Sequence, residues 1–410
     1  MTPRDRLHDA ERRAKDAARN AVPALITGGA GDDPAGVVTY TVVGATTGFS
    51  QLWLLLLSTP MLAAATSMAA RIALSTRAGL GAVIERRYGR ATSIVIVMLL
   101  AIPNIATISA DVAGVASALG MLTGWRWEIF VPLIVVALGL LLRRGYAQMQ
   151  RVLTGFTLVL LTYVAAALLA RPDWLAVARA TLVPAVEMEK VWLLAALGLL
   201  GTTISPYMLF WQATEEVEEL NRGAVIHAHS DASIWIGMIY SNAIAFFIVV
   251  AAAATIHGSN PITTVAQAAK ALTPLHTIGE VAFIVGIVAA GLLALPVLAA
   301  STAYAFADVF GWREGLDVEA GTARAFYLVL GLALIGGGSI SLLPDFHPAA
   351  ALFYSQVLDG VLLPVILLVL LMLSNDRRVV GNDRNPRWVN VVGALTILVA
   401  LAADFAALVT

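Results

Sequence analysis

A short polar stretch inside an apolar run is the most informative part of this sequence. Residues 21–45 are otherwise largely apolar, yet residues 28–36 read Gly-Gly-Ala-Gly-Asp-Asp-Pro-Ala-Gly. Proline removes a backbone hydrogen-bond donor and glycine weakens a helix, so the stretch predicts an interrupted helix. An ionisable residue at membrane depth is costly and by default indicates a functional site. We therefore expect the unwound segment to present the carboxylate of Asp33 to a cation.

A second interruption lies in the middle of the chain. Residues 201–212 read Gly-Thr-Thr-Ile-Ser-Pro-Tyr-Met-Leu-Phe-Trp-Gln, so small polar residues and a proline again break an apolar run. Two interrupted helices in corresponding positions are typical of transporters built from inverted repeats, whose site lies at the bilayer midplane. Unwound backbone is tolerated there because it lines a polar cavity. The alternative is a pair of proline kinks without a ligand, and the acid in the first break disfavours it.

The groups that the two breaks would offer to an ion are all oxygen donors. They are the carboxylate of Asp33, main-chain carbonyls freed near Asp33 and Thr202, the hydroxyl of Ser205 and the amide of Gln356. One carboxylate among oxygen ligands suits hard cations such as Mg²⁺, Mn²⁺ or Ca²⁺. Small residues such as Gly36 would leave room for an ion that keeps several waters, which is how Mg²⁺ usually binds.

Four further polar residues are candidates for the ion pathway: Asp32, Asp111, Tyr207 and Asp359. Asp32 adjoins Asp33, and two neighbouring residues cannot share one helix face, so we expect Asp32 at the rim or in a cap. Asp359 follows Gln356 by three residues and therefore shares its helix face. Asp111 is either a charge near the path or a hydrogen-bonded residue that faces the bundle.

Composition places the chain in the membrane. It is 59% hydrophobic and only 13% charged, with a mean hydropathy of +0.82, whereas soluble domains carry about a quarter charged residues. The absence of cysteine excludes disulfides and thiolate metal sites. The sequence has no basic patch that would indicate a nucleic-acid partner. We find no nucleophile–base arrangement or nucleotide-binding loop of the kind that would indicate an enzyme or a bound cofactor. The expected partners are therefore the lipid bilayer and the transported ion.

Apolar windows of about 20 residues predict eleven transmembrane helices. They cover residues 22–45, 50–74, 92–122, 128–142, 150–170, 190–214, 231–256, 278–307, 323–343, 347–373 and 388–409. We expect one domain over residues 1–410, with inverted repeats at about 22–170 and 190–373 and an extra helix at 388–409.

Basic residues orient this array. Of the 26 lysines and arginines, 21 fall on one side of the predicted spans, the side that holds the N-terminus. The positive-inside rule therefore predicts a cytoplasmic N-terminus and, with eleven spans, an extracellular C-terminus in the plasma membrane. Residues 215–231, which contain four glutamates at their start, are expected to form a solvated acidic loop, and the alternative is a rim that attracts cations at the inner mouth.

These segments resemble the Nramp family of divalent-metal transporters, which has the LeuT-type fold. Residues 33–36, Asp-Pro-Ala-Gly, stand where the family carries Asp-Pro-Gly-Asn, and residues 110–114, Ala-Asp-Val-Ala-Gly, resemble its Thr-Asp-Leu-Ala-Glu. Residues 205–207, Ser-Pro-Tyr, stand at its Met-Pro-His, and residues 355–358, Ser-Gln-Val-Leu, match its tenth helix. The resemblance implies an all-α integral membrane protein with five-plus-five inverted repeats, one extra helix, and helices 1 and 6 broken.

The departures from the family pattern concern its ligands and titratable groups. Gly36 replaces the family's asparagine ligand, and Ser205 replaces its soft methionine ligand. Tyr207 and Gln212 replace two histidines, and Gly114 replaces a glutamate. This pattern resembles the Nramp-related magnesium transporter branch, whose members hold a more hydrated ion and are thought not to couple to protons.

The resemblance therefore implies a Mg²⁺ uptake protein that works by alternating access without proton coupling, with Mn²⁺ as a second candidate ion. Two positive charges that cross about 100 mV gain roughly 4.6 kcal/mol, enough to drive uptake. The main alternative is a proton-coupled Mn²⁺/Fe²⁺ importer. A sodium-coupled amino-acid transporter is disfavoured because Asp33 would repel the substrate carboxylate, and a non-transporting sensor or scaffold is the remaining alternative. The sequence does not determine the oligomeric state, and a monomer is compatible with it.

Overall fold

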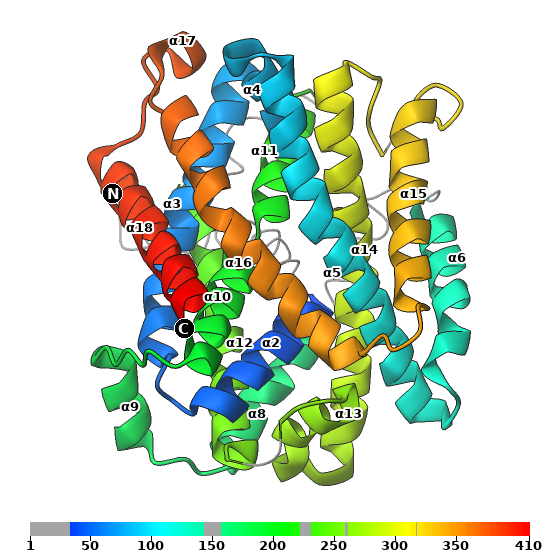
Figure 1. The fold of residues 1–410 in the computed structure, drawn as a ribbon, viewed down its shortest axis with the longest axis vertical. Helices are drawn as coiled ribbons and strands as arrows, with labels where there is room; N and C mark the ends of the chain where they lie inside the picture. The colour runs from blue at the N-terminus through cyan, green and yellow to red at the C-terminus, as the bar shows by residue number, and fades with distance from the viewer. Residues whose placement is uncertain (1–32, 143–156, 222–230, 259–260, 317) are drawn as a thin grey trace, which may run out of the picture.

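The computed structural model describes residues 33–142, 157–221, 231–258, 261–316 and 318–410, and these contain helices, turns and loops with no strand (Figure 1). The α-helices are α2 (Pro34–Thr47), α3 (Leu52–Thr76), α4 (Leu80–Tyr88), α5 (Arg90–Thr123), α6 (Phe130–Leu142), α8 (Leu161–Leu169), α9 (Trp174–Leu182), α10 (Lys190–Thr203), α11 (Pro206–Asn221), α12 (Asp231–Ile256), α13 (Val265–Ala268), α14 (His276–Phe310), α15 (Arg324–Ser341), α16 (Pro348–Leu373), α17 (Arg377–Val380) and α18 (Arg387–Val409). Short 3₁₀ turns are η1 (Trp127–Ile129), η2 (Thr157–Leu160) and η3 (Ala269–Leu275).

Eight segments of the described chain are long and apolar enough to cross a membrane. They coincide with eight of the eleven spans predicted from the sequence. The expected span 128–142 corresponds to a shorter apolar helix, Trp127–Leu142. The expected spans 22–45 and 150–170 lie partly outside the described residues, so the count of eleven stays a prediction.

Glycines allow the central helices to touch backbone to backbone. A Cβ atom at Gly201 of α10 would lie 2.0 Å from the carbonyl oxygen of Gln356 in α16. A Cβ atom at Gly360 of α16 would lie 2.3 Å from the carbonyl oxygen of Leu197 in α10. Small residues at such contacts let membrane helices approach closely and gain van der Waals packing. The contact fixes α10 and α16, which carry the predicted site residues Thr202 and Gln356, against each other.

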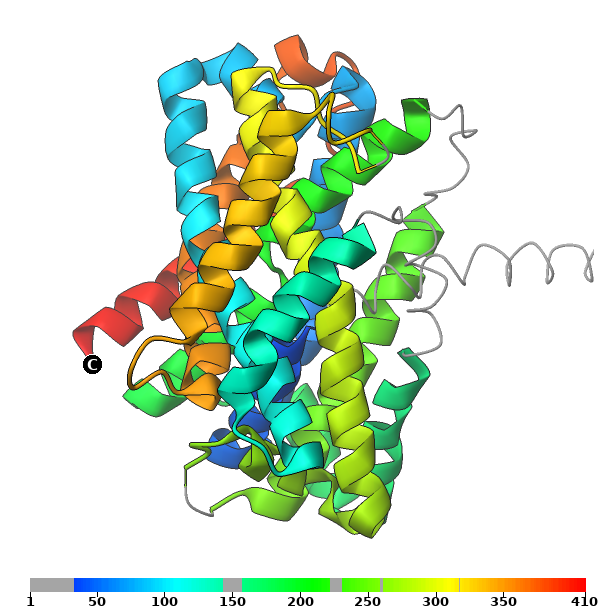
Figure 2. The same cartoon turned by 90° about the vertical axis from the view of Figure 1, so that its right-hand side faces the viewer.

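Burial falls from the centre of the bundle to its edge. The α10–α11 segment is 89% buried within its most apolar window, whereas α18 is only 22% buried. Both views place α18, the red helix, at the edge of the bundle (Figures 1 and 2). Its outward side chains are large and apolar, including Leu398, Leu401 and Phe405. Such a surface suits lipid, and it leaves α10 and α11 as the helices that can line an internal path.

The predicted acidic loop is shorter than expected. Helix α11 continues to Asn221, so the four glutamates between positions 215 and 219 lie on its last turns. The prediction of a loop from residue 215 was therefore wrong. The helix continues because glutamate is a good helix former, and no glycine or proline stops it before residue 221.

Candidate metal site

The predicted break in the sixth span is present. Helix α10 ends and α11 begins with only Ile204 and Ser205 between them, and Ile204 has φ −121° and ψ 58°, outside the helical region. The Ser205 hydroxyl lies 3.0 Å from the carbonyl oxygen of Gly201 and 3.1 Å from that of Thr202, and can donate to either. The serine therefore compensates locally for the helical hydrogen bonds that the break removes. One carbonyl that the sequence offered as a metal ligand is thus also within reach of this hydroxyl.

The break in the first span can be followed from Asp33 onward. Asp33 is the N-cap of α2, with an extended backbone (φ −73°, ψ 169°), and its side chain accepts a 2.5 Å hydrogen bond from the amide of Gly36. The hydroxyl of Tyr207 donates to its other oxygen at 3.3 Å. Asp33 is only 1% exposed. Asp32 and the glycines before it lie outside the described residues.

Gly36 lies where the two breaks meet. A Cβ atom on Gly36 would be 2.7 Å from the hydroxyl oxygen of Thr202 and 3.0 Å from a carboxylate oxygen of Asp33. The buried Thr202 hydroxyl has no hydrogen-bond partner among the described residues. Three of the five predicted site residues therefore adjoin one another across α2 and α10. The absence of a side chain at position 36 is needed for this approach.

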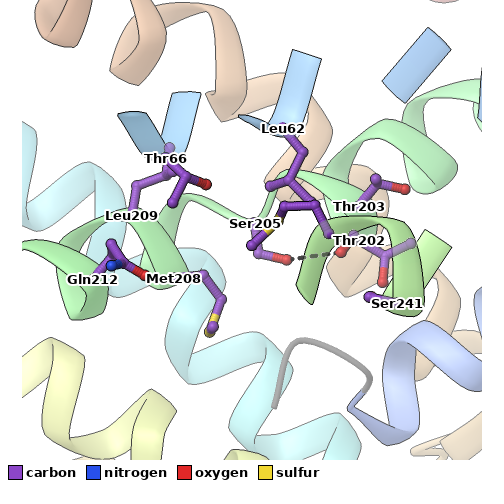
Figure 3. A pocket seen from close by; sticks show the side chains of 10 residues that line it. Leu62, Thr66, Thr202, Thr203, Ser205, Met208, Leu209, Gln212 and Ser241 are labelled. Carbon is purple, nitrogen blue, oxygen red and sulfur yellow. Dashed lines mark hydrogen bonds between the residues drawn. The ribbon is translucent and has the colours of Figure 1, made fainter. Parts of the chain in front are cut away.

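A small cavity lies on another side of Thr202 (Figure 3). Its volume is about 40 Å³, room for a few water molecules at the 10–15 Å³ that each needs by such a measure. Figure 3 shows Thr202 and Ser205 beside one another at its wall. The cavity is lined by Leu62, Thr66, Thr202, Thr203, Ser205, Met208, Leu209, Gln212, Met238 and Ser241. Two predicted site residues thus face open space.

Sequence reasoning missed part of this lining, although the signal was available. Ser205, Met208 and Gln212 are spaced by three and then four residues, so a helix that begins at the proline places them on one face. Met238 and Ser241 share a face of α12 by the same rule. What the sequence could not indicate is that α12 turns that face toward α11.

Gln356, the fifth predicted site residue, lies beside α10 but does not line this cavity. It is fully buried in α16, and its side-chain oxygen has no described hydrogen-bond partner. Its amide nitrogen lies 3.5 Å from the hydroxyl of Ser355. The structure therefore places Gln356 next to the site without bringing it to the cavity that Ser205 lines.

Asp111 and Gly114 have packing roles at the start of α2. A carboxylate oxygen of Asp111 accepts a 2.9 Å hydrogen bond from the amide of Ala35. This bond satisfies a donor at the N-terminus of α2, where a negative charge is also favourable. A Cβ atom at Gly114 would lie 3.1 Å from the side chain of Leu352 in α16 and in ordinary contact with Pro34 at 3.6 Å, so a larger side chain would first press against Leu352. The bundle-facing interpretation of Asp111 fits this contact.

The described residues contain no group of three or more histidine, cysteine, aspartate or glutamate side chains that could hold a metal ion. A site at the breaks would therefore combine the carboxylate of Asp33 with hydroxyl, carbonyl and water oxygens. Oxygen sets with few charges are what Mg²⁺ and Mn²⁺ sites use when the ion keeps part of its hydration shell.

Comparison with known proteins identifies the family. The family described as natural resistance-associated macrophage protein-like, Nramp, matches residues 24–410. This chain belongs to the Nramp family. A relative from Verminephrobacter eiseniae named divalent metal cation transporter MntH is 26% identical over 402 residues, which cover 93% of this chain and 87% of the relative. The family membership inferred from the motifs is thus confirmed, and with its apolar helices this Nramp protein is an integral membrane protein.

Solved structures confirm the fold. The manganese transporter of Eremococcus coleocola matches with a TM-score of 0.72 and 20% identity, covering 94% of this chain and 85% of that one. Mhp1, a nucleobase-cation-symport-1 family transporter, matches with a TM-score of 0.64 and 14% identity over 94% of this chain and 92% of that one. The all-α LeuT-type fold predicted from the motifs is therefore correct. At these identities the likeness concerns the fold alone.

Proposed function

We propose that this Nramp protein carries divalent metal cations across the membrane, and that Asp33 with the oxygens of Thr202 and Ser205 binds the ion. One observation carries the proposal. The buried carboxylate of Asp33 caps a broken helix beside the hydroxyl of Thr202, which has no hydrogen-bond partner among the described residues. The described partners of Asp33 are the amide of Gly36 and the phenol of Tyr207 rather than a cation. A buried anion needs a compensating charge, and a divalent ion would provide it.

For the ion itself, two observations support Mn²⁺ over the Mg²⁺ expected from the sequence. Relatives are named divalent metal cation transporter MntH, and a protein of the same fold is a manganese transporter. Two methionines, Met208 and Met238, line the cavity beside Ser205. Thioether sulfur is a soft ligand that favours transition metals over Mg²⁺. We therefore propose Mn²⁺ as the main cargo and keep Mg²⁺ as the rival.

The transport cycle follows from the breaks. Residues on the two sides of Ile204–Ser205 belong to separate helices, α10 and α11, so one half can move while the other holds its packing. Alternating access would open the site to either side in turn. The excess of basic residues on one side of the spans supports a cytoplasmic N-terminus, and the membrane potential then favours inward movement of the ion.

Flux into liposomes tests this function. We expect the purified protein to admit Mn²⁺ in a saturable manner and Asp33→Ala to reduce that flux to the background rate. The matched control is Asp173→Ala, because Asp173 also caps a helix, α9, with its carboxylate but lies in an exposed segment. Loss of a cap costs about 1 kcal/mol in either case. Equal flux in both variants would contradict the assignment of Asp33.

The same assay separates the ions and the rival functions. Met208→Leu should lower the ratio of Mn²⁺ to Mg²⁺ flux severalfold, and Met372→Leu, a change on the lipid-facing side of α16, should leave the ratio unchanged. A wild-type preference for Mg²⁺ would restore the magnesium interpretation. Entry of a labelled amino acid only with Na⁺ would identify the amino-acid transporter. A folded protein that admits no divalent ion would favour the sensor or scaffold.

A further inference from the structure

Asp359 is a buried acid that the proposed metal site does not use. It lies on α16, is 0% exposed, and neither of its carboxylate oxygens has a hydrogen-bond partner among the described residues. The other two buried acids of this region differ, because Asp33 accepts from Gly36 and Tyr207, and Asp111 accepts from Ala35. An unpaired carboxylate away from water is unfavourable, and buried charges are normally paired or bound to a cation.

Among the described residues, the surroundings of Asp359 supply oxygen atoms and no positive charge. The hydroxyl of Thr107 on α5 is close enough to interact with the carboxylate and is itself buried without a partner. The titratable groups that interact electrostatically with Asp359 are Asp33, Asp111 and Tyr207. None of them is a cation, so the part of the chain that the structure describes leaves the carboxylate uncompensated.

We propose that Asp359, with Thr107, binds a monovalent cation, a proton or a sodium ion, at a second site between α16 and α5. The expected ion is monovalent because the single carboxylate neutralises one positive charge, and one carboxylate with one hydroxyl offers fewer oxygen ligands than the roughly six that a divalent ion needs. Both sources share this chemistry: a proton bonds to one carboxylate oxygen, whereas Na⁺ is held by the carboxylate and hydroxyl oxygens together.

The second site is coupled to the first by charge, and this step rests on the proposed function. Asp33 and Asp359 interact electrostatically. A divalent ion at Asp33 would repel a cation at Asp359, so each ligand weakens the binding of the other by the same factor. Arrival of Mn²⁺ is therefore expected to release the monovalent ion, and this release would link metal binding to a second cation.

Binding of Mn²⁺ to the purified full-length protein tests the proposal in two arms. In the proton arm, we expect release of about one proton for each Mn²⁺ bound in weakly buffered solution, as deprotonation on metal binding would give. In the sodium arm, replacing choline by Na⁺ at constant pH and ionic strength should weaken Mn²⁺ binding about tenfold. Asp359→Asn should abolish whichever effect the wild type shows. Asp404→Asn, which removes another acid with an unpartnered oxygen but on the peripheral helix α18, should change neither.

The outcomes decide between the sources or overturn the site. A wild type that shows neither effect, or an Asp359→Asn variant that keeps the effect, contradicts the proposal. If Asp359→Asn does not fold, Thr107→Val keeps the carboxylate and should change monovalent binding severalfold. Na⁺ should bind more weakly because it loses an oxygen ligand, whereas a proton should bind more tightly because the anionic carboxylate loses a nearby donor. An unchanged Thr107→Val then contradicts the proposal. If the wild type binds no Mn²⁺, the metal function fails separately. In that case Asp359 can be tested without Mn²⁺. The melting temperature is measured in Na⁺ and in choline, and at several pH values, for the wild type and for the Asp359→Asn and Thr107→Val variants.

Discussion

Asp33 and Asp359 are two fully buried aspartates in one bundle, and their surroundings are opposite. Asp33 caps a helix and receives hydrogen bonds from Gly36 and Tyr207 at a break in the fold. Asp359 lies within the continuous helix α16 and receives none from the described residues. The pair teaches that burial alone does not define a site. The donors around a carboxylate indicate whether it is held ready for one particular ligand or requires a compensating charge.

The contact between α10 and α16 joins these two regions, so breaking it should have the largest effect on stability. Gly201→Ala places a methyl group 2.0 Å from a backbone oxygen of α16, and no side-chain rotation can relieve that clash. We expect about 1–3 kcal/mol of destabilisation from overpacking. Thermal unfolding in detergent measures it.

The matched control is Gly139→Ala. Gly139 lies on α6, and a Cβ atom there would meet nothing within 4 Å. Its substitution should be neutral or slightly stabilising, because alanine favours helix over glycine. Equal melting temperatures for the two variants would show that the α10–α16 contact adapts, and that the two carboxylates are not held in fixed relation.

A third acid, Glu314, extends the comparison through a smaller effect, the dependence of stability on pH. Glu314 lies in the segment between α14 and α15, and burial, together with Asp308 and Glu218, raises its pKa to about 8 from 4.5. Between these two values the folded protein holds a proton that the unfolded chain releases. The free energy of unfolding should therefore fall as the pH rises through this window. Glu314→Gln should flatten the fall.

The control for this measurement is Glu319→Gln, an exposed acid in the same segment. The measurement is the melting temperature of each protein between pH 5 and pH 8.5, a range that spans the ordinary and the raised pKa values of carboxylates. It gives the slope of stability against pH. A wild-type stability that rises with pH while both variants follow it would contradict the assignment to Glu314.

The sequence was sufficient for the fold and for two structural features at the candidate site, a helix break and a buried cap. Proline and small polar residues within apolar runs predicted the break at Ile204–Ser205, and the motifs predicted the family. The acid directly before Pro34 predicted a buried carboxylate, and in the structure Asp33 caps α2 with it. These features are local, because the residues that cause a break or a cap lie within a few positions of it.

What the sequence could not supply were contacts between distant helices. The hydrogen bond from the hydroxyl of Tyr207 to Asp33 joins residues that are 174 positions apart in the sequence. The cavity combines faces of α3, α11 and α12, so the role of Met238 depended on how the helices are turned. The sequence separated Asp33, which lies in a break before Pro34, from Asp359, which lies in an unbroken apolar run. It could not show that Asp33 has two hydrogen-bond donors whereas Asp359 has only the nearby hydroxyl of Thr107 among the groups described above, because that difference arises from packing.

The location of a bound Mn²⁺ ion tests the central claim most directly. Anomalous X-ray diffraction from crystals grown with Mn²⁺, compared with crystals of Asp33→Ala, would show the ion without reliance on transport. We predict one anomalous peak in contact with the carboxylate of Asp33 and next to Thr202 and Ser205, absent in the variant. A peak centred on Asp359, or one that persists when Asp33 is replaced, would contradict the account.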